Sequence, residues 1–286
     1  MRDLIVSLLP RRAPFKRKPD SDKEANRKFW WKIYDKTLTV LNIIFFPLLV
    51  LIVWHLLAIS GQLLEVILPS PATVWKAFIK MVNSGLLAKD LGVSLQRVLI
   101  GYAWGAALGL ILGIFCGLLK FFERFFRTIV DFIRQIPPMA WMPLLILWFG
   151  IGETSKAILI AKSVFVPVFL NTIRGVHGAS HEYIELSRVL ELRYSKHLRK
   201  IIIPSALPSV FTGLRLGVGA AWMSVVAAEM LGGLSGVGYA LIVAKDFILS
   251  DQLFAMMLVI GFVGFFTDRI LGLLERFVFR WKKASA

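Results

Sequence analysis

Six apolar stretches, each long enough to cross a lipid bilayer, constrain this chain more than any other feature of its sequence. A membrane-spanning helix needs about 20 predominantly apolar residues, because in lipid every backbone polar group has to be hydrogen-bonded within the protein. With 57% hydrophobic residues among 286, the chain also fits no ordinary soluble domain. The sequence therefore predicts an all-α polytopic membrane protein. Its six expected transmembrane helices are 38–59, 91–119, 129–149, 155–175, 206–230 and 252–278.

The Lys and Arg residues between these stretches predict how the chain is oriented. Alternate segments, beginning with the N-terminus, hold 24 of them, whereas the intervening loops hold 5. Cytoplasmic loops carry the excess of positive charge. Both termini and the charged segment 182–208 are therefore expected in the cytoplasm. The net charge of +16 sits mainly at the ends of apolar runs, which fits orientation signals better than a nucleic-acid-binding patch.

Sequence motifs for catalysis or for binding a metal or cofactor are missing. The single cysteine, Cys116, lies inside an apolar run, so a disulfide framework is not expected. The four histidines are scattered, and no His/Cys/Asp/Glu cluster has the spacing of metal ligands. The sequence also contains no Walker A loop for phosphates. We therefore expect no catalytic residue, no metal and no cofactor bound by this chain.

The polar and basic N-terminus is expected to precede the membrane domain as a separate element. Ser21 and Glu24 form a capping box that would open a helix over about 22–36, interpreted as an interfacial helix. A solvated tail is the alternative. The expected organisation is a cytoplasmic basic tail with this helix (1–37), the first transmembrane helix with an outer-surface segment (38–90), a transmembrane core (91–278) and a cytoplasmic tail (279–286).

Glycines recur every four positions along the second expected span. Such a ridge lets another helix approach closely, because a glycine carries no side chain. We therefore expect tight helix packing along this face. The glycines are Gly101, Gly105, Gly109, Gly113 and Gly117.

Paired prolines interrupt the third expected span at Pro137 and Pro138. Proline breaks the helical hydrogen-bond ladder, and membrane proteins tolerate this only where protein or water satisfies the freed carbonyl groups. We interpret this span, including Trp141, as a kinked helix lining a translocation path. A buried kink without that role is the alternative.

The fifth expected span carries polar and aromatic residues on one helical face, because they are spaced by three and four. This stripe consists of Thr212, Arg215, Gly219, Trp222, Val226 and Glu229. The positions opposite are wholly apolar and suit lipid or core. These are Leu214, Val218, Ala221, Val225 and Ala228.

Charged residues at similar depths predict two ion pairs, since charges inside a membrane usually pair with one another. Arg97 and Glu229 lie near the outer face and are expected to meet, or to meet their counterparts across a dimer, and to hold an outer gate. Lys162 is the competing partner for Glu229. Arg215 and Asp268 are expected to form a structural pair. Five basic residues against two acidic ones would leave a weakly positive path for a small anion. The basic residues are Arg97, Arg134, Lys162, Arg215 and Arg269.

The charged segment 182–208 resembles the EAA loop of binding-protein-dependent ABC importers. Glu185, Leu186 and Ser187 lie at its E-A-A positions, and Ile201 to Pro204 lie at its I-x-L-P positions with the right spacing. The resemblance implies a short helix that docks on a cytoplasmic ATPase and couples ATP hydrolysis to the membrane helices. Glu191 stands where the family has a glycine, which suits tight turns. This difference puts the shape of the loop in question.

Further stretches resemble the branch of these permeases that serves alkanesulfonates, taurine and nitrate-type anions. Six of them follow one another in family order between about residues 68 and 280. They are Leu68–Pro71, Ser94–Val98, Ile136–Trp141, Leu147–Gly152, Thr212–Arg215 and Ala228–Gly232.

The resemblance implies the type I ABC importer permease fold in the cell membrane. It also implies a homodimer of this chain, two copies of an ATPase subunit that binds ATP and Mg²⁺, and an extracytoplasmic substrate-binding protein. Aliphatic sulfonate or taurine is the first expected substrate, with nitrate or bicarbonate next. A small heterocyclic nutrient is the alternative. A channel or secondary transporter without an ATPase would not need segment 182–208.

Overall fold

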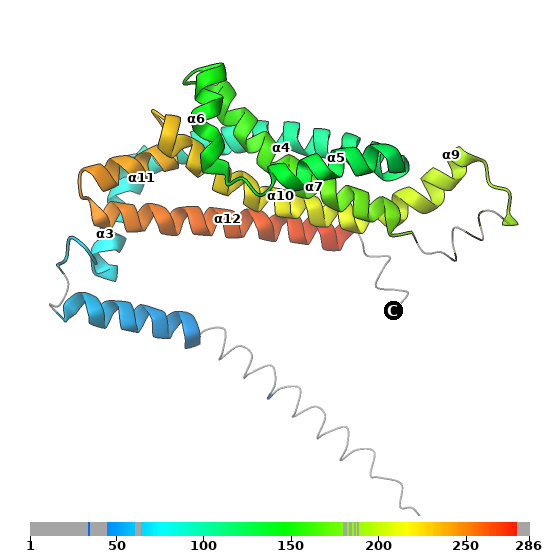
Figure 1. The fold of residues 1–286 in the computed structure, drawn as a ribbon. Coiled ribbons are helices and arrows are strands. Elements are labelled where there is room, and N and C mark those ends of the chain that lie inside the picture. The colour runs from blue at the N-terminus through cyan, green and yellow to red at the C-terminus, as the bar shows by residue number, and fades with distance from the viewer. Residues whose placement is uncertain are drawn as a thin grey trace, which may run out of the picture. The chain divides into compact units, whose positions relative to one another are not determined.

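The computed structural model describes residues 45–60, 64–179 and 189–278, together with residues 34, 182, 185 and 187. Every regular element in these residues is a helix (Figure 1). The chain divides into two compact units, Met1–Gln62 and Leu63–Ala286. The described part of the first unit contains the apolar helix Phe45–Ile59. The rest of the first expected span, nearly all of the expected interfacial helix and the tail 279–286 lie outside the described residues.

The second unit contains four helices that are long and apolar enough to cross a membrane. They correspond to the second, fourth, fifth and sixth expected spans. The helix that corresponds to the fifth span, Ser195–Gly232, includes α10. The elements of this unit, in chain order, are α3 (Pro71–Asn83), α4 (Leu86–Leu118), α5 (Lys120–Ile133), α6 (Pro138–Phe149), α7 (Glu153–His177), α9 (Tyr194–His197), the π-helix η1 (Leu198–Ile202), α10 (Ile203–Gly232), α11 (Val237–Asp246) and α12 (Ser250–Val278).

The third expected span, 129–149, is interrupted at the predicted prolines, but the interruption is a break between two helices and not a kink within one. The chain forms α5 and α6 instead, separated by a break at residues 134–137. Pro138 is the physical reason, because a proline keeps the residue before it out of the helical region. Pro137 accordingly has an extended backbone, with φ −54° and ψ 143°. α6 has 12 residues and spans about 18 Å, too little to cross a bilayer alone.

Helix α7 is central to the second unit, because both α4 and α10 pack along it. The glycine ridge of α4 faces α7, which confirms the expected close packing. A Cβ atom placed on Gly105 would lie 2.3 Å from the backbone oxygen of Ala161, and one on Gly113 would lie 2.6 Å from the Thr172 side chain. The two helices are therefore in contact through backbone, and side chains on the ridge would force them apart.

The apolar face of α10 forms the core of the unit. Its residues Ala221, Val225 and Ala228 are fully buried. Two of them, with Val164 and Val168 of α7, belong to one apolar cluster. Of the two environments considered for this face, the structure shows the core and excludes lipid. α12 completes the unit by packing on α10 and α11.

Candidate functional site

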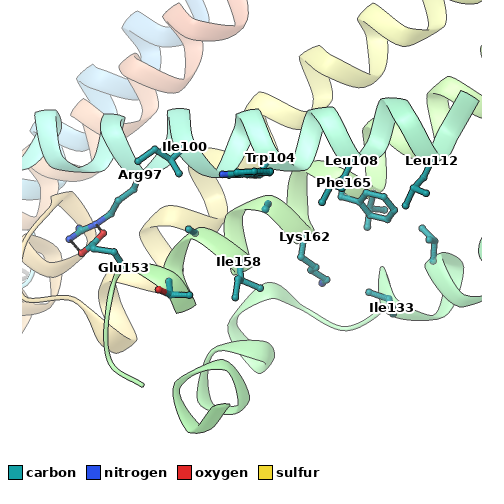
Figure 2. Close-up of a pocket in the computed structure, with 15 residues that line it drawn as sticks. Arg97, Ile100, Trp104, Leu108, Leu112, Ile133, Glu153, Ile158, Lys162 and Phe165 are labelled. Atoms are coloured by element: carbon teal, nitrogen blue, oxygen red, sulfur yellow. Dashed lines mark hydrogen bonds and ion pairs between the residues drawn. The ribbon is translucent and has the colours of Figure 1, made fainter. Parts of the chain in front are cut away.

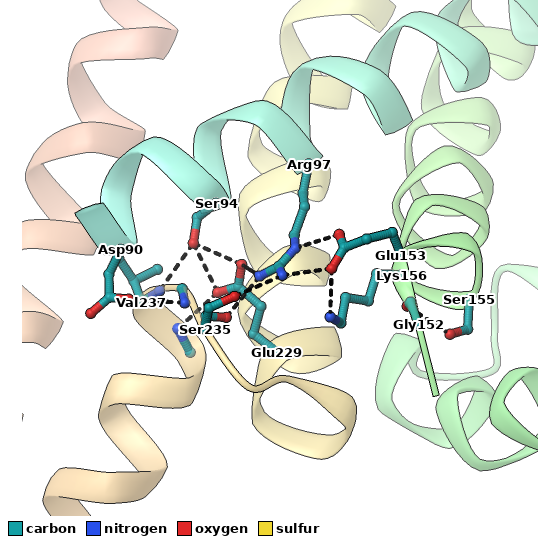
Figure 3. Close-up of polar contacts among 12 residues, drawn as sticks. Asp90, Ser94, Arg97, Gly152, Glu153, Ser155, Lys156, Glu229, Ser235 and Val237 are labelled. Carbon is teal, nitrogen blue, oxygen red and sulfur yellow. Dashed lines mark hydrogen bonds and ion pairs between the residues drawn. The ribbon is translucent and has the colours of Figure 1, made fainter. Parts of the chain in front are cut away.

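A network of charged side chains joins α4, α7 and α10 at their expected outer ends (Figure 3). Arg97, Lys156 and Glu229 are buried, whereas the Glu153 side chain is 66% exposed. Its centre is the guanidinium group of Arg97, whose side chain is 7% exposed. Arg97 donates two hydrogen bonds of 2.7 Å to the carboxylate of Glu153. It donates one of 2.8 Å to Glu229, one of 2.7 Å to the carbonyl of Ser235 and one of 3.0 Å to the Ser235 hydroxyl. A guanidinium group has five N–H donors, so every donor of Arg97 is used.

The carboxylate of Glu229 is fully buried and fully hydrogen-bonded. Besides Arg97, it accepts the Ser94 hydroxyl at 2.7 and 2.9 Å and the backbone N–H of Gly238 at 2.9 Å. Gly236 lets the chain pass beside it, because a Cβ there would lie 2.3 Å from the carboxylate and the residue has a positive φ of 102°. A buried carboxylate needs such partners to remain stable without water.

Lys156 completes the network by binding Glu153 at 3.0 Å. The two basic and two acidic side chains balance, so the network is electrically neutral. The structure confirms the expected pair of Arg97 and Glu229, within one chain, and excludes Lys162 as the partner of Glu229 in this structure. Glu153 and Lys156 were not among the predicted ion-pair residues, because both lie at the boundary between an expected loop and the fourth expected span. Their spacing of three residues at the start of a span was the available signal.

A second ion pair joins α10 to α12. Arg215 donates two hydrogen bonds to Asp268, at 2.6 and 2.7 Å. Glu275 lies 3.7 Å from the same guanidinium group. The expected structural pair is therefore confirmed. Both of its side chains are 41% exposed, so it is far more accessible than the Arg97 network.

The expected surplus of five basic residues over two acidic ones is corrected by these pairings. Glu153, Glu275, Asp131 and the basic Lys156 were left out of that count, so six basic residues accompany five acidic ones, and Asp131 lies 3.2 Å from Arg134. The stripe on α10 is also divided, because Trp222 and Glu229 are buried while Thr212 is exposed. It does not form one open path in this structure.

A cavity of about 790 Å³ lies between α4, α5 and α7 (Figure 2). Arg97 and Glu153 lie at one end of it, and the other lining side chains are mainly apolar, among them Trp104 and Phe165. Lys162 also lines this cavity, and its ammonium group lies 5.0 Å from the ring of Trp141 on α6. The expected path residues Pro137, Pro138 and Trp141 therefore lie beside Lys162, at the break before α6.

The segment that resembles the EAA loop retains the turn that the family glycine would allow. Glu191 adopts a positive φ of 47°, a conformation that is uncommon for residues with a side chain. Ser187 is 5% exposed, and its hydroxyl lies 2.8 Å from a ring nitrogen of His197. Ile201 lies in η1 and Pro204 in the first turn of α10. Leu186 lies outside the described residues.

Glu191→Gly is expected to stabilise this turn by about 1 kcal/mol, because glycine adopts a positive φ without a steric cost. The change should raise the affinity for a docking partner by about fivefold if the turn orders on binding. The measurement is thermal stability together with partner affinity. Glu191→Ala is the matched control, since it removes the carboxylate but keeps the Cβ atom. Equal gains in both variants would show that the carboxylate, and not the backbone, is responsible.

A family described as "Binding-protein-dependent transport system inner membrane component" matches residues 109–280. The chain belongs to this permease family. It is therefore a multi-pass protein of the cell membrane and a transport subunit that works with an ATPase and a substrate-binding protein.

Relatives of the permease match over most of their length. SsuC of Bacillus subtilis (strain 168), named for aliphatic sulfonates transport, is 37% identical and covers 83% of the permease and 86% of the relative. The nitrate import permease protein NrtB of Synechocystis sp. is 34% identical, with coverages of 80% and 85%. The taurine transport system permease protein TauC of Escherichia coli (strain K12) is 31% identical, with a match over 81% of the permease.

Among solved structures, the crystal structure of an amino acid ABC transporter with histidines is similar in fold to the permease. The TM-score is 0.57 at 18% identity, and the match covers 70% of the permease and 97% of that chain. At this identity the similarity supports the fold alone.

Proposed function

We propose that the permease moves a small anion into the cytoplasm, with an aliphatic sulfonate or taurine as the first candidate and nitrate or bicarbonate next. The observation that carries this proposal is the shared chemistry of three relatives, which are named for aliphatic sulfonates, nitrate and taurine. Each of the three named molecules carries either a sulfonate group or the nitrate anion, although the molecules differ in size.

The proposed assembly contains two copies of the permease, two copies of a separate ATPase subunit that binds ATP and Mg²⁺, and an extracytoplasmic binding protein. The permease itself then has no catalytic role. Segment 182–208 docks on the ATPase, and the partly buried contact between Ser187 and His197 supports this by fixing the start of the segment against α9. The Arg97 network holds the outer end of the path closed, because it ties together the helices that would have to separate.

The direct test is ATP-driven uptake by proteoliposomes that contain the permease, its ATPase and its binding protein. Radiolabelled ethanesulfonate, taurine, nitrate and bicarbonate are compared with an uncharged heterocycle. Uptake of at least one of the anions, dependent on ATP, is expected. Uptake of the heterocycle alone would contradict the proposal.

Glu185→Lys is expected to uncouple the complex while the permease still inserts into the membrane. A docking helix makes few contacts, and one misplaced charge at an interface costs about 2–5 kcal/mol, which corresponds to roughly a 30-fold or larger loss of affinity. Co-purification of the ATPase and uptake are the two measurements. Asp246→Lys, a charge reversal at an exposed residue of α11 outside segment 182–208, is the control. Full retention of the ATPase and of uptake in Glu185→Lys would refute the docking role.

A further inference from the structure

Lys162 is a charged side chain at the middle of a membrane-spanning helix. It lies nine residues after Glu153, which begins α7, so it is about 14 Å along the helix. The apolar core of a bilayer is about 30 Å thick, which places Lys162 near its centre. A charge at this depth is costly and is normally paired or functional.

Lys162 has no carboxylate within 4.0 Å among the residues that the structure describes. Its contacts are the backbone oxygen of Ile136, at a long 3.5 Å, and the face of the Trp141 ring. The neighbouring charges offer no partner, because Glu153 and Glu229 are taken up by Arg97 and Lys156. Lys162 therefore differs from Arg97 and Arg215, whose charges are compensated, and has ammonium donors left for another group.

The break before α6 adds further positive potential at the same place. Ile136 lies in this break, and α6 begins two residues later at Pro138. The start of a helix carries a partial positive charge and favours anions. The indole N–H of Trp141, in the first turn of α6, is buried and has no hydrogen-bond partner in the described structure. Ile136, Pro138 and Trp141 do not line the cavity that Lys162 lines, so these groups add positive potential behind Lys162 and do not contact the contents of the cavity.

The cavity between α4, α5 and α7 reaches Lys162 and is chiefly apolar. Its volume of about 790 Å³ lies within the range of small-molecule sites. Arg97 lines its far end but has no donor left, because all five of its N–H groups are bonded within the network. Lys162 is therefore the basic residue of this cavity that can bind an anion, and apolar side chains such as Leu108 and Phe165 surround the remaining space (Figure 2).

We propose that Lys162 holds the sulfonate group of a transported alkanesulfonate at mid-membrane, with its alkyl chain in the cavity between α4, α5 and α7. The proposal rests on the function proposed above and names a substrate site for it. A sulfonate matches a site with one cation and few further donors, and the apolar walls match an alkyl chain. The absence of a complete cage keeps the binding weak enough for the substrate to leave.

The test compares ethanesulfonate with hexanesulfonate in ATP-driven uptake by the reconstituted complex. Lys162→Met, which keeps the length of the side chain but removes its charge, is expected to lower uptake of both by about 20-fold or more, as loss of a charged hydrogen bond does. Lys162→Arg is expected to retain part of the uptake. Lys245→Met, the same substitution at an exposed lysine on α11, is the matched control and should transport like the parent.

Ala161→Leu tests the cavity separately from the charge. Ala161 lines the cavity beside Lys162, and a leucine there takes up space that the alkyl chain would use. We expect uptake of hexanesulfonate to fall by about 10-fold and that of ethanesulfonate by much less, since the cost follows the volume lost. Co-purification of the ATPase with each variant shows that the complex still assembles.

The outcomes separate the two proposals. Parent-level uptake by Lys162→Met, or an equal loss of both sulfonates in Ala161→Leu, would overturn the site while leaving the import function in place. The second outcome would mean that the alkyl chain does not occupy this cavity. Failure of the parent to import either sulfonate would overturn the proposed substrate and the site with it. If Lys162→Met does not assemble, Lys162→Arg and Ala161→Leu still decide the question.

Discussion

Replacing Arg97 by methionine is expected to lower the free energy of unfolding by about 3–5 kcal/mol, because it leaves a buried charge without its partner. Glu229 is fully buried and its only cationic partner among the described residues is Arg97. Ser235 would lose its hydrogen bonds to Arg97 in the same step. The expected result is a strong loss of folded protein in detergent extracts, measured by thermal unfolding and by yield.

Arg215→Met provides the matched control for this prediction. Arg215 is also a membrane arginine with two hydrogen bonds to one carboxylate, but its side chain is 41% exposed. Asp268 is equally exposed, so this variant leaves no carboxylate enclosed in the protein core and should lose less stability than Arg97→Met. Adding Glu229→Gln to Arg97→Met should restore part of the loss, because the buried charge is then gone. Equal losses in the two arginine variants would contradict the assigned role of burial.

Gly105→Ala is expected to disrupt the packing of α4 on α7, although it adds a single methyl group. The new Cβ atom would lie 2.3 Å from the backbone oxygen of Ala161 and 2.8 Å from the Cβ of Val164. Neither atom belongs to the end of a flexible side chain, so the helices themselves would have to separate. Overpacking of this kind typically costs about 1–3 kcal/mol, and a rigid backbone contact belongs at the upper end. Thermal unfolding of the purified permease is the measurement.

Gly92→Ala is the control for this second prediction, because Gly92 lies on the same helix with no atom within 4 Å of the added Cβ. Alanine favours a helix over glycine by up to about 1 kcal/mol, so Gly92→Ala should be neutral or stabilising. A similar loss in both variants would show that helix propensity, and not the contact with α7, determines the effect.

The length of the apolar runs was sufficient to predict α4, α7, α10 and α12, because a bilayer imposes a minimum length on any helix that crosses it. The depth of Arg97 and Glu229 along their helices was sufficient to predict that they meet. The four-residue spacing of the glycines predicted a close helix contact, although it did not identify α7 as the partner. Each of these features depends on a single helix or on the depth of a residue in the membrane.

The remaining features depend on how neighbouring elements meet, and a single sequence carries little signal for that. The paired prolines were sufficient to predict an interruption of the run 129–149, but not that it separates two helices, because hydropathy does not register the extended backbone at Pro137. Glu153 was placed in a loop, and its role in neutralising Arg97 and Lys156 was therefore missed. Glu191 adopts a left-handed backbone conformation that residues with a side chain rarely adopt. The turn is therefore kept, although the loss of the family glycine had put the shape of the loop in question.

The saturation of Arg97 has a consequence for how the outer end of the helix bundle can move. One guanidinium group holds the start of α7, the end of α10 and the turn before α11 through five hydrogen bonds. Because these bonds share one rigid, planar group, a shift of any one element misaligns several of them at once. If these elements separate only partly, the N–H donors of Arg97 that are freed gain no new protein partner. We therefore expect opening at this end to break these bonds together and not one at a time.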